Sequence, residues 1–118
     1  MTRFNNNNRG KKLMDAKEKI KDLVNNNDIC LFMKGTPDAP QCGFSMAVAN
    51  VLKHLNVKFH GVNILEDEGL RQGIKEYSDW PTIPQLYIKS EFVGGCDIVK
   101  EMFEKGELKK MLKNKSLI

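Results

Sequence analysis

The feature that most restricts the fold of this chain is a continuous apolar run, Ile29-Cys30-Leu31-Phe32-Met33. Five apolar residues without a polar interruption predict a β-strand that is buried on both faces, the kind found inside a sheet with parallel pairing. Such a strand needs helices on both sides of its sheet. The run therefore predicts an α/β fold.

Apolar residues at helical or strand spacing place the other elements around this strand. Helices are expected at about residues 13–23, 44–55, 67–77 and 98–103, with a last turn or two at 108–112. β-branched and aromatic residues predict a second strand at residues 57–64 and a hairpin formed by 86–88 and 92–93.

The expected order of elements gives a definite topology. A right-handed β-α-β crossover makes the first two strands parallel, and the hairpin adds antiparallel strands. We therefore predict a four-stranded mixed sheet flanked by helices, with an extra N-terminal helix, in one domain over residues 13–118. Residues 1–12 are basic and Asn-rich. A disordered tail is favoured there over the remnant of an organelle-targeting segment.

Composition narrows the classes of function. The chain of 118 residues has no apolar run that approaches the length of a membrane span. Its net charge of +4 is modest, and lysines alternate with acidic residues, which indicates a solvated surface. We expect neither a membrane nor a nucleic-acid partner. Three cysteines, an odd number spread far apart, indicate reduced thiols in a reducing compartment, the mitochondrial matrix or the cytoplasm.

Cys42 is the candidate reactive group. The segment Cys42-Gly43-Phe44-Ser45 lies between the apolar strand and the strongest helical pattern, which places the Cys42 sulfur at a helix N-terminus. Unpaired backbone N–H groups and the helix dipole favour the thiolate there, the form that attacks disulfides and binds metals. Lys34 follows the strand and could add positive charge. A buried apolar filler is the alternative role for Cys42, but its loop neighbours argue against it.

Ser45 stands where a Cys-x-x-Cys redox pair has its second thiol. A mixed disulfide at Cys42 can therefore not be resolved by the residue three positions on, and it must await another thiol.

Four motifs in a fixed order make the chain resemble the monothiol glutaredoxins of the Cys-Gly-Phe-Ser class, from about Leu13 to Leu112. The motifs are Met33-Lys34-Gly35-Thr36, Cys42-Gly43-Phe44-Ser45, Trp80-Pro81-Thr82-Ile83-Pro84-Gln85 and Gly94-Gly95-Cys96-Asp97. The resemblance implies a thioredoxin fold, which agrees with the predicted order of elements.

The resemblance also implies a glutathione site. In the proteins that this chain resembles, cations at the positions of Lys34 and Arg71 hold one carboxylate of glutathione, and a cis-proline at the position of Pro84 presents the preceding backbone to the ligand. The second carboxylate goes to a helix N-terminus. The implied glutathione-binding residues are Lys34, Phe44, Arg71, Thr82, Ile83, Pro84, Gly95, Cys96 and Asp97.

Two of these residues have alternatives. Asp97 faces the ammonium group of the ligand, caps its helix, or does both. Cys96 contacts glutathione through its backbone or pairs with Cys42 under oxidation.

Two functions from different classes follow. A [2Fe–2S] cluster takes four thiolate ligands, so one Cys42 from each of two chains and two glutathiones would complete the set. The resemblance implies such a labile cluster in a homodimer, received from scaffold proteins and passed to recipient proteins. The alternative is a glutathione-dependent oxidoreductase, with weak activity at most, that reduces protein–glutathione mixed disulfides. The longer loop from Gly35 to Gln41 goes with cluster transfer in the family. A zinc-binding module is not expected, because the chain has no Cys-x-x-Cys pair and no His near its cysteines.

Overall fold

The computed structural model describes residues 16–118. The predicted tail at 1–12 and the first predicted helical residues lie outside the described residues. Residues 16–26 are helical. The remaining elements are β1 (Ile29–Met33), α2 (Gly43–His54), β2 (His60–Asn63), the 3-10 helix η1 (Ile64–Glu66), α3 (Glu68–Ser78), β3 (Gln85–Ile88), β4 (Glu91–Gly94), α4 (Cys96–Glu104) and α5 (Glu107–Asn114).

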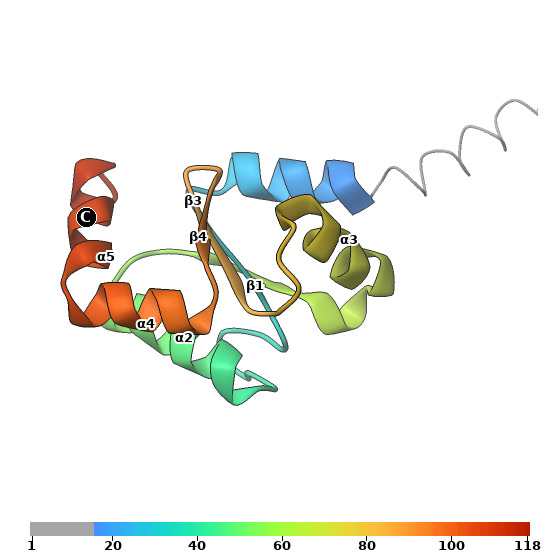
Figure 1. The fold of residues 1–118 in the computed structure, drawn as a ribbon, viewed down its shortest axis with the longest axis horizontal. Coiled ribbons are helices and arrows are strands. Elements are labelled where there is room, and N and C mark those ends of the chain that lie inside the picture. The colour runs from blue at the N-terminus through green and yellow to red at the C-terminus, as the bar shows by residue number, and fades with distance from the viewer. Residues whose placement is uncertain (1–15) are drawn as a thin grey trace, which may run out of the picture.

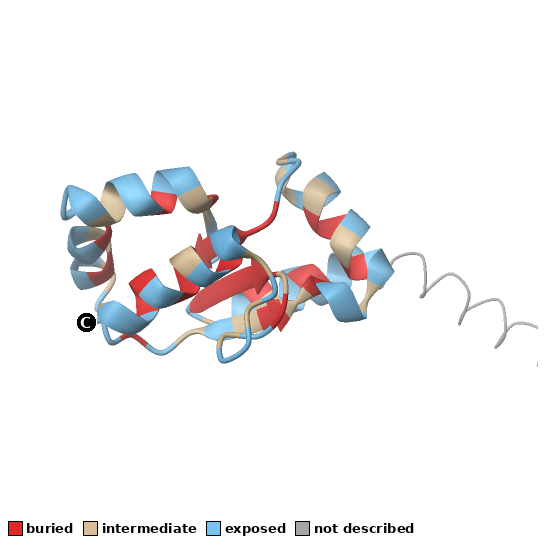
Figure 2. Ribbon diagram, turned by 90° about the horizontal axis from the view of Figure 1, so that it is seen from below, coloured by how far each residue is buried: buried red, intermediate tan, exposed pale blue. Residues whose placement is uncertain are grey.

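The sheet has four strands in the order β2-β1-β3-β4. β1 pairs parallel with β2 and antiparallel with β3, and β4 pairs antiparallel with β3. Every residue of β1 is buried because this strand is internal and has helices on both sides (Figures 1 and 2). The predicted mixed sheet and the helix over residues 16–26 are confirmed.

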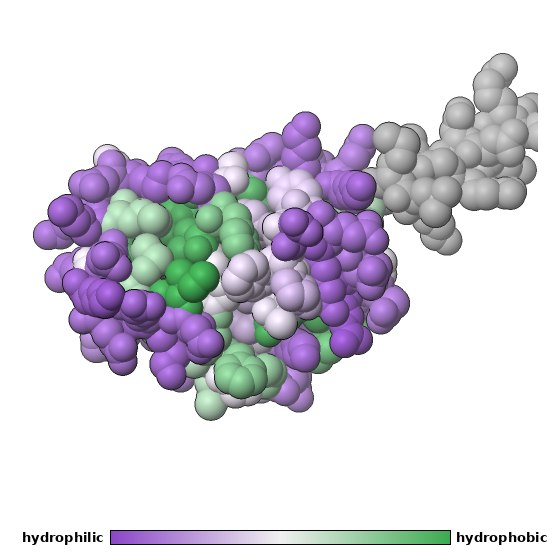
Figure 3. Space-filling model, viewed as in Figure 1, coloured by the Kyte–Doolittle hydropathy of each residue, from purple (hydrophilic) through white to green (hydrophobic). Residues whose placement is uncertain are grey.

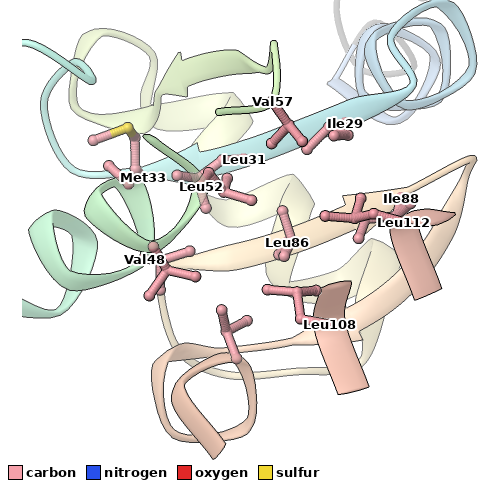
Figure 4. Close-up of a cluster of buried hydrophobic side chains, with 13 residues drawn as sticks. Ile29, Leu31, Met33, Val48, Leu52, Val57, Leu86, Ile88, Leu108 and Leu112 are labelled. Atoms are coloured by element: carbon pink, nitrogen blue, oxygen red, sulfur yellow. The ribbon is translucent and has the colours of Figure 1, made fainter. Parts of the chain in front are cut away.

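The core divides into two clusters, one on each face of the sheet. Alternate side chains of β1 point to opposite faces. Ile29, Leu31 and Met33 pack with side chains of α2, α4 and α5, as Figure 4 shows for most of this cluster. Cys30 and Phe32 face the N-terminal helix and α3. Burial on both faces explains why the strand has no polar residue.

The second strand is shorter than the sequence pattern predicted, because β2 begins at His60 and not at residue 57. Asn56 takes the left-handed conformation (φ 60°) that ends α2, and the Val57 N–H bonds back to the Leu52 carbonyl at 3.3 Å. The amide of Val57 is therefore used in the helix cap. Its side chain is buried in the core, which accounts for its strand-like character in the sequence.

The surface is hydrophilic around most of the face shown in Figure 3, with an apolar patch in the region of β4, α4 and α5. Among residues 16–118, no helix combines the length and the hydropathy that a membrane crossing requires.

Candidate thiol and ligand-binding site

Cys42 is the N-cap residue of α2, with an extended backbone (φ −152°, ψ 137°). An N-cap side chain faces the N–H groups of the second and third helical residues, which here are Phe44 and Ser45. The Ser45 N–H is the largest cause that lowers the pKa of Cys42. Burial is the next largest and raises it, and the Phe44 N–H, the charge of Lys34 and the Ser45 hydroxyl lower it further. The thiolate at Cys42 is therefore favoured, as the sequence predicted.

The other two cysteines differ from Cys42. Cys30 is fully buried in β1, and burial raises its pKa to about 12. Cys96 is the first residue of α4 and is half-buried. Burial raises the pKa of Cys96, although Lys100 opposes the shift. Among the three thiols, only Cys42 is biased toward the anion.

A groove of about 720 Å³ opens beside Cys42. It lies between the starts of α2 and α4, the side of α3, and the loop that precedes β3. All ten residues that the sequence singled out line this groove, although they come from five separate segments. Lys34 follows β1, Phe44 is in the first turn of α2, Arg71 is in α3, Thr82, Ile83 and Pro84 precede β3, and Gly95, Cys96 and Asp97 begin α4.

The charges around the groove suit an anionic ligand. Lys34, Arg71 and Lys75 line it, against the single carboxylate of Asp97. Sequence reasoning missed Lys75. Its position four residues after Arg71 in α3 places both cations on one face of the helix, and this spacing could have identified it. Trp80, Pro81 and Ile98 also line the groove and were not predicted.

The loop before β3 presents an unpaired stretch of backbone to the groove. The Ile83–Pro84 peptide bond is cis, as the resemblance implied. Among the residues that the structure describes, no hydrogen bond uses the backbone N–H or C=O of Ile83. A ligand with its own peptide groups could pair there in the manner of a short strand.

The two glycines before α4 meet different requirements. Gly94 has φ 150°, and a Cβ atom there would lie 2.9 Å from the side chain of Ile98. A Cβ atom at Gly95 would lie 3.3 Å from the Pro84 carbonyl oxygen and 3.3 Å from Trp80 Nε1. The start of α4 therefore lies against the cis-proline loop, a close backbone approach that the missing side chain of Gly95 permits.

Ser45 has a structural role that its spacing from Cys42 did not indicate. Its side chain is fully buried, and its hydroxyl accepts a hydrogen bond from the Lys34 N–H at 3.0 Å. Asn63 accepts from the next N–H, that of Gly35, also at 3.0 Å. These two contacts fix the end of β1, and with it Lys34, relative to Cys42. Sequence reasoning missed them because they join residues far apart in the chain.

Comparison with known proteins agrees with this geometry. A family model described as Glutaredoxin matches residues 29–93. "Monothiol glutaredoxin-S14, chloroplastic" of Arabidopsis thaliana is 62% identical over 92 residues, which are 78% of this chain and 53% of that protein. "Monothiol glutaredoxin-5, mitochondrial" of Lachancea kluyveri is 52% identical over 103 residues, which are 85% of this chain and 72% of that protein.

Among solved structures, a monomeric truncated mutant of Trypanosoma brucei 1-C-Grx1 superposes with a TM-score of 0.80 at 45% identity, covering 86% of this chain and 93% of that one. The chain belongs to the glutaredoxin family, and within it to the monothiol glutaredoxins. It spans about half the length of the Arabidopsis relative. The two relatives carry the names of different organelles, so the comparison leaves the compartment open.

Proposed function

We propose that this protein carries a labile [2Fe–2S] cluster in a glutathione-ligated homodimer and transfers it to recipient proteins. The observation that carries the proposal is the placing of one thiolate-prone cysteine, Cys42, at the edge of a groove lined by cations. A half-buried thiolate at the edge of a site for an anionic peptide is suited to share a cluster with a bound thiol.

The number of available ligands supports an assembly of two chains. Residues 16–118 contain no group of three or more His, Cys, Asp or Glu side chains placed to hold a metal ion. Cys96 lines the same groove, but its raised pKa makes it the poorer ligand. Cys42 from each of two chains and the sulfur of one glutathione on each would supply four thiolates.

The residues around the groove fit glutathione. Lys34 and Arg71 would bind one carboxylate, and the N-terminus of α4 would receive the other, with Asp97 facing the ammonium group. The free backbone of Ile83 would pair with the peptide. These roles, and those of Phe44, Thr82, Pro84, Gly95 and Cys96 as neighbours of the ligand, are part of the proposal.

The edge of the groove is suited to contact other proteins. Phe44 and Ile98 line it and remain 62% and 37% exposed. Exposed apolar residues beside a reactive group favour protein partners. We propose cluster scaffolds and recipient apoproteins as those partners, in a reducing compartment, the mitochondrial matrix or the cytoplasm, with neither nucleic acid nor membrane involved.

The lowered pKa of Cys42 also favours a second function, that of a glutathione-dependent oxidoreductase, which needs no cluster. The Cys42 thiolate would attack the glutathione sulfur of a protein–glutathione mixed disulfide and release the protein thiolate. A second glutathione would then release Cys42 and leave as glutathione disulfide. This activity is expected to be weak, because the longer loop from Gly35 to Gln41 goes with cluster transfer and poor reductase turnover in the family.

Anaerobic reconstitution with iron, sulfide and glutathione tests the carrier function. We expect visible absorption and a mass of two chains in the presence of glutathione, loss of both in Cys42→Ser, and retention of both in the matched control Cys96→Ser. A colourless monomer that turns over glutathionylated substrates would reject the carrier function and leave the oxidoreductase.

A further inference from the structure

Gln85 is the one fully buried polar side chain in the described part of the chain besides Ser45. It is the first residue of β3 and lies opposite Phe32 of β1 in the sheet. A buried amide is costly unless its hydrogen-bonding groups are paired. An apolar residue would suit this core position, so the amide requires an explanation in its contacts.

Each contact of the Gln85 side chain has a defined partner. Its Nε2 donates to the Trp80 carbonyl at 3.0 Å and to the Thr82 carbonyl at 3.1 Å. Its Oε1 accepts from the Tyr87 hydroxyl at 3.4 Å, which is a long contact. Both amide hydrogens therefore hold the loop that forms one wall of the groove.

This loop has few other fixed points. The Trp80 N–H bonds to the Lys75 carbonyl at 3.2 Å and to Ser78 Oγ at 3.1 Å. Beyond Trp80, no backbone–backbone hydrogen bond among the described residues fixes the loop before it enters β3. The Ser78 hydroxyl reaches the Trp80 carbonyl at 3.5 Å, and the Ile83 side chain packs in the core. Among the described residues, Gln85 is the only hydrogen-bond partner of the Thr82 carbonyl.

We infer that Gln85 is a positioning residue that sets the preference of Cys42 for glutathione over thiols without peptide groups. The inference rests on the proposed glutathione site. Gln85 orients the backbone at Thr82 and Ile83 before the ligand arrives, which lowers the entropy lost on pairing. It does not line the groove, and the groups that lower the pKa of Cys42 lie at the start of α2 and at Lys34.

The test is a pair of thiol–disulfide exchange equilibria. Cys42 thiolate attacks glutathione disulfide, a Cys42–glutathione disulfide forms, the original S–S bond breaks, and glutathione thiolate leaves. The same exchange with hydroxyethyl disulfide gives a mixed disulfide without peptide groups. The ratio of the two equilibrium constants measures the preference, and the rate of Cys42 alkylation by iodoacetamide measures the thiolate alone.

Two variants remove the donors of Gln85. Gln85→Met keeps the length of the side chain, and Gln85→Glu keeps an acceptor. We expect the ratio to fall about tenfold in both, with the alkylation rate within about twofold of wild type, because the loss is confined to the peptide contact. Tyr87→Phe removes the long contact to Oε1 and the interaction of the hydroxyl with Ser78 but keeps both donors of Gln85. Ile88→Val loosens the same strand on its other face. Both controls should keep the ratio.

The outcomes separate the inference from the proposed function. A wild-type protein without preference for glutathione would overturn both. A wild-type preference that survives in both Gln85 variants, or that falls equally in Ile88→Val, would overturn the inference alone. If the variants do not fold, the test is the rate at which the Gln85 side-chain amide protons of the wild-type protein exchange with solvent. Slow exchange supports the inference, and exchange at the rate of exposed amides overturns it.

Discussion

The starts of α2 and α4 face the same groove, and each carries a cysteine, but the two thiols have opposite properties. Cys42 is the N-cap residue, so its sulfur faces N–H groups of its own helix, and its pKa falls. Cys96 is one position further in, after the N-cap Gly95, and burial raises its pKa. Of these two thiols, only the one at the cap position is activated by its helix start.

The same difference bears on the ligand. At α2 the Ser45 and Phe44 N–H groups lower the pKa of the protein's own Cys42, although its side chain makes no cap hydrogen bond. At α4 the N-cap is a glycine without a side chain, and it makes no side-chain cap hydrogen bond. The N–H groups of α4 are therefore left for a carboxylate from outside. One groove thus combines a helix start that serves the protein's own sulfur with a helix start suited to a bound anion.

The largest expected effect comes from removing each thiol in turn. Cys42→Ser should abolish the mixed disulfide with glutathione, because the thiolate-prone sulfur is lost, whereas Cys96→Ser should form it in full. Intact mass after incubation with glutathione disulfide measures both. A full adduct on the Cys42→Ser protein would contradict the comparison.

A methyl group at each helix start gives the next effect. Gly94→Ala should lower the free energy of unfolding by about 1–3 kcal/mol, because the Cβ atom meets Ile98 at a positive φ. Gly43→Ala, where a Cβ atom meets nothing within 4 Å, should be neutral or stabilising by up to about 1 kcal/mol. Urea denaturation followed by circular dichroism distinguishes them, and equal losses would mean that the α4 start is not tightly packed.

Cations of the groove should separate ligand binding from thiol activation. Lys75→Gln should weaken retention of glutathione about threefold to tenfold and leave the pKa of Cys42 unchanged. Lys34→Gln should weaken retention of glutathione and also raise the pKa of Cys42, because the Lys34 charge lowers that pKa. The exposed Lys109→Gln on α5 is the matched control. Competition with a small thiol measures retention, and a raised Cys42 pKa in Lys75→Gln would reject this separation.

The smallest effect is expected for Ser45→Ala. The Lys34 N–H would lose its partner, which should cost about 1–2 kcal/mol of stability. The pKa of Cys42 should rise only slightly, because the Ser45 hydroxyl is the smallest of the causes that lower it and the N–H of residue 45 remains the largest. Absorbance of the thiolate against pH measures the change, and a return of the Cys42 pKa to the ordinary value for cysteine would assign the main role to the hydroxyl.

The sequence predicted the order of elements and the residues of the groove because both depend on local patterns: periodicity for the helices, and short motifs for Cys42, Pro84 and Asp97. It did not predict the anchors of the groove. Ser45, Asn63 and Gln85 act through hydrogen bonds to backbone groups, and the partners of Ser45 and Asn63 are 11 and 28 residues away. Such pairs exist only once the strands and helices are in place. The start of β2 was predicted at residue 57 because Val57 is a β-branched core residue, although it lies in the cap of α2 and the strand begins at His60.

Site-resolved alkylation against pH is the most direct test of the central claim that the cap position activates Cys42. Labelling with iodoacetamide and mass spectrometry of the peptides would follow all three thiols in one sample. The pKa of Cys42 should lie below the ordinary value for cysteine and that of Cys96 above it, with Cys30 unlabelled until the protein unfolds. As pH falls from 9 toward 6, labelling of Cys96 should therefore be lost first. Equal pKa values at Cys42 and Cys96, or the reverse order, would contradict the account.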